Sequence, residues 1–440
     1  METNSTTAIM EIEEGHRMSQ NIGKKIKYFR TKAKMTQDEL ARGIISVSYL
    51  SKIESNNAYP SPEIMGLLCE RLNVDPNKTD EDNTSALCVE WFKSILDPDI
   101  NKATKLYEKI ENTIEGIIDA GFIHLVEIHK LHFFILTDQK QLVESQLQYL
   151  NEGFSFQSNT EKYYYNKFLG NYYFYHMNYK KALTSFIEAE KLIDKNIYFF
   201  KSDQSDLYYL LSITASKLYH SHLALVYATK ALEYYQSIFD LERSAKCHIL
   251  LGISYFRTKE HDKAIASYEL AGKIGKTMNN NELLSLSNQN LGRLYSITGN
   301  KEKAINYFLT SYEFKKESPK ADKVITIISL LKEYYDLNDM ESAKKWLHLG
   351  LSLSEELTPT DSYYIYEIEV YHHLIYGYGE DFENLLVDRI LPFFEEKQLL
   401  NEKAMFESIL ADFYFHNRKY KSAALYYRSA NKSLKEVYLD

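Results

Sequence analysis

The side chains in this sequence best suited to chemistry are basic ones gathered near its beginning. Between Gln20 and Asn57, eight lysines and arginines stand against three acidic residues, so this segment carries about +5. The whole 440-residue chain carries a formal net charge of −9. A basic segment on an acidic protein predicts that one end of the molecule binds a polyanion. The basic residues are Lys24, Lys25, Lys27, Arg30, Lys32, Lys34, Arg42 and Lys52.

A second set of polar residues has the chemistry to bind a peptide. Asparagine and glutamine amides both donate to and accept from a peptide backbone, and lysine and arginine pair with carboxylates. Six such residues occur in a helix-pair pattern that repeats along the chain and contains a leucine. Each lies two positions before or after that leucine, or next to such a position. They are Lys167, Asn171, Gln289, Asn290, Arg293 and Lys332. The alternative is that they are solvated residues on helix exteriors.

Catalytic motifs do not occur in the sequence. It contains no phosphate-binding glycine loop, HExxH, GxSxG or CxxC. His129 and His132, like His372 and His373, lack a carboxylate or cysteine partner at metal-ligand spacing, so we expect helix-surface histidines. We therefore expect no enzyme, no cofactor and no metal site.

The basic segment predicts a small bundle of four helices. Thr36 is placed as an N-cap, with Glu39 three residues later completing a capping box. Gly43 marks a tight turn, where a residue without a Cβ is favoured. The helices are expected over about Ile22–Ala33, the residues after Thr36, Val47–Glu54 and Ser61–Leu72. The second and third form a helix-turn-helix.

The motifs TQ-x-EL-A, a glycine, S-x-S-YLSKIE and N-x-YPS occur there in order. Together they resemble the Xre/Cro type of DNA-binding domain, over about Gln20 to Val74. This resemblance implies that Gln37 holds a phosphate and that the second helix of the motif faces the major groove. The DNA-binding residues it implies are Thr36, Gln37, Ser46, Val47, Ser48, Tyr49 and Lys52. The alternative for each serine is a cap or a solvent-facing side chain.

The rest of the chain repeats one pattern of two short helices joined by a turn. Its clearest copy runs from Leu169-Gly170 to Ala189, and the same spacing begins again at Leu251, Leu291 and Leu410. Leucine and tyrosine place an apolar stripe on the first helix, and a small residue lets the second helix approach. Weaker copies are centred on Ala103, Leu142, Ala224, Ala343 and Glu383. The turns are predicted near His176, Lys259, Thr298 and Asn338.

The period of about 40 residues is typical of a helix-pair solenoid, in which stacked units bury a continuous core. The pattern resembles tetratricopeptide repeats, with roughly six more residues per unit than the usual 34. We therefore expect an all-α protein, with the helix-turn-helix bundle followed by a tetratricopeptide-like superhelix of about nine units. The first helices of the pairs should line its concave groove, with the six polar residues inside.

Four parts are predicted along the chain. They are a disordered extension at 1–17, the DNA-binding domain at 18–74, an acidic linker at 75–85, and a repeat domain for peptide binding and oligomerisation at 86–440. Three widely spaced cysteines favour a reducing compartment, and neither a secretory signal nor a run of about 18 apolar residues is found. We expect a cytoplasmic protein.

The pairing of these two parts is similar to one family, the peptide-responsive quorum-sensing regulators of Gram-positive bacteria that include PlcR and NprR (the RNPP family), and nearer its longer NprR-like members. The resemblance implies a short signalling peptide in the groove, a two-fold operator in double-stranded DNA, and a homodimer or larger assembly. The alternative, from another class, is a repeat scaffold that binds and sequesters a cytoplasmic signalling protein, as a resemblance to Rap-like proteins allows.

Overall fold

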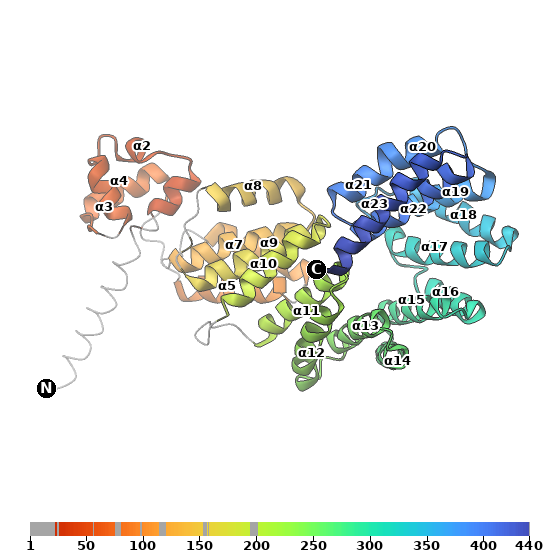
Figure 1. Cartoon of the computed structure of the whole chain (residues 1–440). Helices are drawn as coiled ribbons and strands as arrows, with labels where there is room; N and C mark the ends of the chain where they lie inside the picture. The colour runs from red at the N-terminus through yellow and green to blue at the C-terminus, as the bar shows by residue number, and fades with distance from the viewer. Residues whose placement is uncertain are drawn as a thin grey trace. The chain divides into compact units, whose positions relative to one another are not determined.

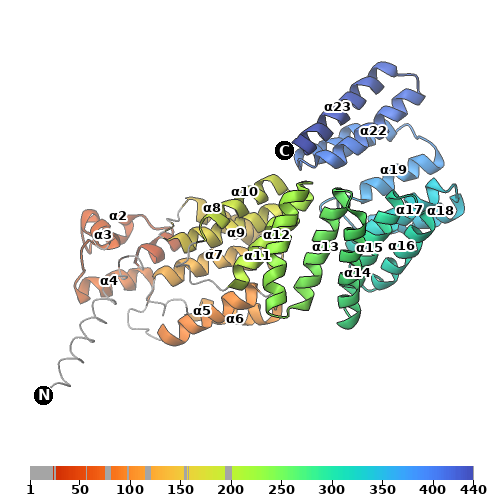
Figure 2. The ribbon, with the colours of Figure 1, turned by 60° about the horizontal axis from the view of Figure 1, so that its bottom comes forward.

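The chain is described by a computed structural model, drawn in two views in Figures 1 and 2. The structure describes residues 23, 26–55, 57–74, 81–96, 99–113, 120–152, 156, 158–193 and 201–439. It divides into two compact units, residues 1–171 with 192–197, and residues 172–191 with 198–440. The described residues form helices and no strand, so the predicted all-α class is confirmed.

The first unit begins with a small helical bundle, here called the head (residues 26–74). Residues 26–32 are helical and are followed by α2 (Gln37–Ala41), α3 (Val47–Glu54) and α4 (Pro62–Leu72). The buried core of the head consists of Ile26, Leu40, Ala41, Leu50, Ile53 and Leu68. Gly43 has a φ of +75°, which favours glycine at the turn between α2 and α3. The predicted helix-turn-helix bundle is confirmed.

Further helices complete the first unit. They are α5 (Glu81–Leu96), α6 (Ile100–Thr113), α7 (Ala120–Leu136), α8 (Lys140–Glu152) and most of α9 (Asn159–Tyr175), through which the unit boundary passes. Helix α5 already begins inside the predicted linker 75–85, because helix starts favour the same polar residues as linkers. Residues 75–80 and the predicted extension 1–17 lie outside the described residues. The repeat marker placed at Leu142 is one residue off, since Leu142 is 44% exposed and Val143 is buried.

A buried hydrogen bond joins the head to α7. The hydroxyl of Tyr28 donates to a carboxylate oxygen of Glu127 at 2.5 Å. Lys130 and Gln146 each donate to the same carboxylate at 3.0 Å. Because Tyr28, Glu127 and Lys130 are all buried, the head packs against α7 through this contact. Val47, Ser48 and Lys52 on α3 stay exposed.

The second unit contains the remaining helices. They are α10 (Tyr179–Lys191), α11 (Lys201–Lys217), α12 (Ser221–Ser237), α13 (Leu241–Arg257), α14 (His261–Thr277), α15 (Asn281–Ile297), α16 (Lys301–Phe314), α17 (Lys320–Asp336), α18 (Met340–Ser354), α19 (Ile365–Tyr376), α20 (Phe382–Asn384), the π-helix η2 (Leu385–Ile390), α21 (Leu391–Glu396), α22 (Leu400–His416) and α23 (Tyr420–Leu439). Taken in chain order, helices α5 to α23 make the nine pairs that the period predicted.

The degenerate unit predicted at Glu383 is irregular in the structure. Its second helix is broken into α20, η2 and α21. Pro392, in the first turn of α21, has no N–H to donate to the preceding turn. The wider π turns therefore come just before the position where an α-helical hydrogen bond is missing.

The first helix of most pairs ends in the same turn. The N–H of Asn300 donates to the carbonyl of Tyr295 at 2.9 Å, and Glu260 donates to Tyr255 at 2.8 Å, as in a Schellman C-cap. A residue with positive φ precedes the donor, and these residues include Met177, Tyr219, Lys259, Gly299, Asn338 and Arg418. The turns predicted near His176, Lys259, Thr298 and Asn338 are confirmed.

The glycine of the repeated leucine-glycine pair lets an aromatic ring pack on bare backbone. A Cβ on Gly292 of α15 would lie 2.6 Å from the ring of Phe308 on α16. Gly252 of α13 faces the ring of Tyr268 on α14 in the same way. A side chain in either place would push the two helices of the pair apart, which explains why the two residue types occur at this spacing.

The first and last helices of the second unit pack against each other. Figures 1 and 2 show the end of α23 close to the first helices of this unit. Met177 and Tyr179 share one apolar core with Phe394 and Phe406. The Asn401 amide donates to the Tyr219 hydroxyl, 182 positions away in the sequence, at 2.7 Å. The beginning and the end of the second unit are therefore in direct contact.

Candidate functional site

Helix α3 presents a polar face to solvent. Its buried side carries Leu50 and Ile53, which belong to the core of the head. The hydroxyl of Ser46 caps the helix by accepting the N–H of Tyr49 at 3.2 Å. Ser46, Val47, Ser48, Ser51 and Lys52 are exposed on the other side. A short helix with small polar residues at its exposed start fits the geometry of major-groove recognition.

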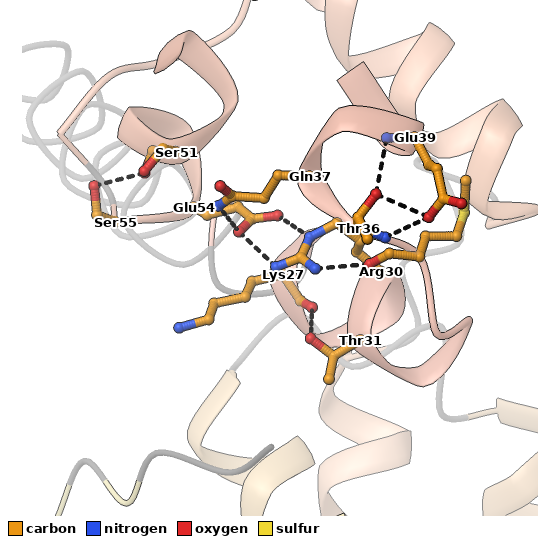
Figure 3. A network of polar contacts seen from close by, with 10 residues as sticks. Lys27, Arg30, Thr31, Thr36, Gln37, Glu39, Ser51, Glu54 and Ser55 are labelled. Atoms are coloured by element: carbon orange, nitrogen blue, oxygen red, sulfur yellow. Dashed lines mark hydrogen bonds and ion pairs between the residues drawn. The ribbon is translucent and has the colours of Figure 1, made fainter. Parts of the chain in front are cut away.

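A buried carboxylate fixes α3 against the rest of the head (Figure 3). Glu54 accepts Nε of Arg30 at 2.6 Å and Nε2 of Gln37 at 2.8 Å. Arg30 also donates to the carbonyl of Met35 at 2.8 Å. The guanidinium of Arg30, counted above among the cations for a polyanion, is thus engaged inside the head. Gln37 keeps one amide hydrogen for the phosphate contact that the resemblance implies.

The predicted capping box at the start of α2 is confirmed. The N–H of Glu39 donates to the Thr36 hydroxyl at 3.2 Å, and the N–H of Thr36 donates to the Glu39 carboxylate at 2.7 Å. The hydrogen bonds that the N–H and the hydroxyl of Thr36 donate to this carboxylate lower the pKa of Glu39. Tyr49 is half-buried and its hydroxyl donates to the carbonyl of Tyr59 at 3.0 Å.

Five of the eight basic residues that the sequence singled out are exposed in the described part of the head. Lys27, Lys32, Lys34, Arg42 and Lys52 are exposed, while Lys24 and Lys25 lie outside the described residues. The sequence interpretation missed Arg71, whose Nη1 donates to the carbonyl of Leu40 at 3.0 Å. Arg71 therefore supplies a hydrogen-bond donor to a backbone carbonyl at the end of α2. No spacing of nearby residues in the sequence indicates this role.

Two of the predicted peptide-binding residues lie on α9 in the first unit. Lys167 is 1% exposed, so the expectation that it faces an open groove is wrong. Asn171 is half-buried, with its amide 3.3 Å from Nδ1 of His132. His129 is fully buried, which corrects the expectation of a surface histidine. Burial lowers the pKa of His129 and of His132 to about 3.

The other four lie in the second unit. Gln289 is buried, and its amide accepts from Thr326 at 2.7 Å and donates to Ser329 at 3.0 Å. The expectation that Gln289 faces the groove is therefore wrong, because this position meets the first helix of the next pair. Arg293, two residues after the leucine, is exposed. Asn290 donates to the carbonyl of Leu286 at 2.8 Å.

Lys332 is half-buried and forms an ion pair with the carboxylate of Glu367 on α19. Residues two positions after the repeated leucine thus carry the accessible charges, whereas those two positions before it are covered. This difference separates Arg293 and Lys332 from Lys167 and Gln289.

The structure adds two cations that the sequence interpretation missed. Lys217 and Arg257 are the last residues of α11 and α13, at equivalent places in successive pairs. The Arg257 guanidinium lies 4.2 Å from the centre of the Tyr219 ring. Lys217, Tyr219, Asn401 and Glu402 line a small pocket where the ends of the second unit meet. The 40-residue spacing between Lys217 and Arg257 matches the repeat period, and this was the sequence signal that could have identified the two cations.

No described helix combines the length and the apolar character needed to cross a membrane. Among the described residues, no three histidine, cysteine, aspartate or glutamate side chains are grouped as metal ligands. Two candidate sites have accessible polar side chains: the exposed face of α3, and Asn290, Arg293 and Lys332 in the second unit.

Models of two known families match parts of the chain. A helix-turn-helix family matches residues 26–78, and the tetratricopeptide repeat matches residues 245–274 and 286–318. The transcriptional activator NprA of Geobacillus stearothermophilus is 37% identical over 409 residues, covering 90% of this chain and 99% of NprA. Response regulator aspartate phosphatase A of Bacillus subtilis (strain 168) is 26% identical, covering 79% of this chain and 93% of that protein.

Solved structures share the fold. A Rap protein complexed with competence and sporulation factor aligns with a TM-score of 0.67 and 20% identity, over 81% of this chain and 98% of that one. The quorum sensor NprR complexed with its cognate peptide NprX aligns with a TM-score of 0.64 and 19% identity, over 80% of this chain and 98% of that one. At identities of 20% and 19%, these alignments show a shared fold alone.

Proposed function

This chain belongs to the NprR-like family of peptide-responsive quorum-sensing transcription regulators, and on that premise we propose that it binds a two-fold DNA operator under the control of a short signalling peptide. The observation that carries the DNA half of the proposal is the exposed polar face of α3, braced by the buried Glu54. The polar inner residues of the second unit support the peptide half.

In the proposed DNA complex, α3 of each head lies in the major groove of one half-site. Ser48 and Lys52 face base edges or phosphates, Val47 supplies an apolar contact, and Ser46 and Tyr49 lie at the margin of the contact. Thr36 and Gln37, at the start of α2, lie near a phosphate.

The proposed peptide site keeps Asn290, Arg293 and Lys332, whose side chains are accessible or half-buried. Peptide contact with several adjacent pairs changes the curvature of the repeats. In a homodimer, that change resets the distance between the two heads to the half-site spacing. NprR with its peptide NprX supports this part by likeness of fold.

The DNA proposal is tested by selecting an operator from randomised duplexes with the full chain and then measuring binding of variants. Lys52→Ala should weaken operator binding roughly tenfold and reduce the salt dependence by about one phosphate contact. Lys316→Ala, an exposed lysine of the second unit, is the matched control. Equal binding by both variants contradicts the assignment of α3.

The peptide proposal is tested by mass spectrometry of small molecules that co-purify with the full chain from its native host. A synthetic copy of the peptide found should change operator affinity. The absence of any bound peptide, together with operator binding that no added peptide changes at micromolar concentration, overturns this half of the proposal.

A second candidate function is favoured by the alignment with response regulator aspartate phosphatase A, which covers 93% of that protein. In this case the repeats bind a signalling protein and sequester it. A double variant, Ser48→Glu with Lys52→Glu, removes DNA binding while leaving both side chains on an exposed face. If the protein still alters signalling in cells that carry this variant, the scaffold function is supported; loss of every effect favours DNA binding alone.

A further inference from the structure

Three cations lie near one another in the second unit. Lys217 and Arg257 end α11 and α13, and Arg293 lies one helical turn before the end of α15. The Arg257 guanidinium lies over Tyr219 and donates to the carbonyl of Ser216 at 2.5 Å. Burial lowers the pKa of Lys217, the nearby Glu402 opposes this shift, and Arg257 and Arg293 add to it.

A single carboxylate of α22 is directed at this group of cations. Glu402 accepts a hydrogen bond from the Tyr219 hydroxyl at 3.4 Å, and its neighbour Asn401 donates to the same hydroxyl at 2.7 Å. Burial raises the pKa of the Glu402 carboxyl, and the nearby Lys217 opposes this shift. Glu436, the other carboxylate lining the pocket, lies 3.7 Å from Lys180 instead.

Glu402 and Lys217 line the same pocket, beside the Tyr219 ring on which Arg257 packs. Lys217, Arg257 and Arg293 all lie near Glu402, while Glu367, a second carboxylate close to Glu402, pairs with Lys332. Glu402 reaches the three cations from the far end of the unit, across 185 positions of sequence from Lys217. Arginine guanidinium groups prefer carboxylate partners, because the planar N–H donors of the guanidinium match the two oxygens of a carboxylate.

We propose that Lys217, Arg257 and Arg293 form a subsite for a carboxylate of the signalling peptide, and that Glu402 occupies this subsite until the peptide displaces it. The inference rests on the proposed peptide function and names the chemistry of the ligand. Displacement of Glu402 also removes a contact of α22 with Tyr219. Peptide binding is thereby coupled to the closure of the second unit.

The test uses the full chain and a random octapeptide library made twice, once with a free C-terminal carboxylate and once with a C-terminal amide. Retained peptides are identified by mass spectrometry. A carboxylate subsite retains the free-acid library about tenfold better, the size expected for a charge-assisted pair. If the carboxylate comes from a side chain instead, both libraries are retained equally and the bound sequences are enriched in Asp and Glu.

Two pairs of variants complete the test, with a retained peptide as the probe. Glu402→Gln should bind it several-fold more tightly than the wild type, since the internal competitor loses its charge, whereas Glu436→Gln should not. Arg257→Met should lose about tenfold in affinity, whereas Lys263→Met, at an exposed cation of α14, should not. Circular dichroism melts establish that each variant is folded.

The possible failures are distinct. If neither library yields a bound peptide, the proposed peptide function fails. If peptides bind without preference for a carboxylate, and Arg257→Met and Glu402→Gln bind them as the wild type does, the subsite is refuted while the peptide function stands.

Discussion

Buried polar side chains of the second unit hydrogen-bond to one another. Lys315 Nζ donates to the Thr326 hydroxyl at 2.9 Å, and that hydroxyl donates to Gln289 at 2.7 Å. Lys315 is buried, and burial lowers its pKa to about 8. Gln289 was expected to bind a ligand, but in this structure its amide links α15 to α17.

Lys315→Met should change how stability depends on pH. Because the pKa in the folded protein is lower than the ordinary 10.5, the unfolded chain holds more protons between about pH 8 and pH 10.5. Wild-type stability therefore rises with pH across this window, relative to the methionine variant, by up to about 3 kcal/mol. Chemical denaturation at pH 7, 9 and 10.5 measures the difference.

The control for this experiment is Lys316→Met, at an exposed neighbour that pairs with Glu313. Its stability should follow the wild type at every pH. A constant difference between Lys315→Met and the wild type across the window would show that Lys315 has an ordinary pKa.

At the scale of helices, the paired glycine and aromatic residue set the distance between the two helices of a unit. Gly292→Ala should destabilise the second unit by about 1–3 kcal/mol, because the new methyl group overlaps the Phe308 ring. Thermal unfolding measures the effect. Gly66→Ala in α4 is the opposite case, since nothing lies within 4 Å of the added Cβ, and it should be neutral or stabilising. Equal effects of both changes would contradict close packing at Gly292.

The packing of the head on α7 gives a second prediction at this scale. Tyr28→Phe removes the hydrogen bond at 2.5 Å to the buried Glu127 and should cost about 1.5–3 kcal/mol, because the acceptor is charged. Tyr49→Phe, which removes an exposed bond to the carbonyl of Tyr59, should cost less than about 1 kcal/mol. Denaturant unfolding followed by tyrosine fluorescence compares the two variants; a Tyr28→Phe variant as stable as Tyr49→Phe would mean that the head is not docked through this contact.

At the scale of the second unit, closure brings residues from α11 and α22 together. Asn401→Ala removes the donor to Tyr219, so the turn between α11 and α12 should exchange its amide hydrogens faster. Hydrogen exchange measured by mass spectrometry on peptides covering residues 215–222 follows this change. Asn417→Ala is the control, because the Asn417 amide donates to the carbonyl of Phe413 in the last turn of the preceding helix α22. Unchanged exchange in Asn401→Ala would show that the Tyr219 contact does not hold the unit closed.

Much of the architecture was predictable from the sequence, because it depends on residues close together in the chain. Thr36 and Glu39 indicate a helix start, and Gly43 indicates a turn. Glycine and aromatic residues at a fixed spacing indicate a helix pair. Helix periodicity and capping act over a few residues, so the nine pairs and the helix-turn-helix could be placed without coordinates.

The tertiary structure alone decided which polar residues are accessible and which distant residues meet. Lys167 and Gln289 share a repeat position with no local sign of burial, yet neighbouring helices cover both. The contact between Tyr219 and Glu402 depends on the curvature added by every intervening pair. Small rotations between successive units accumulate along a solenoid, and no pattern within one repeat encodes their sum.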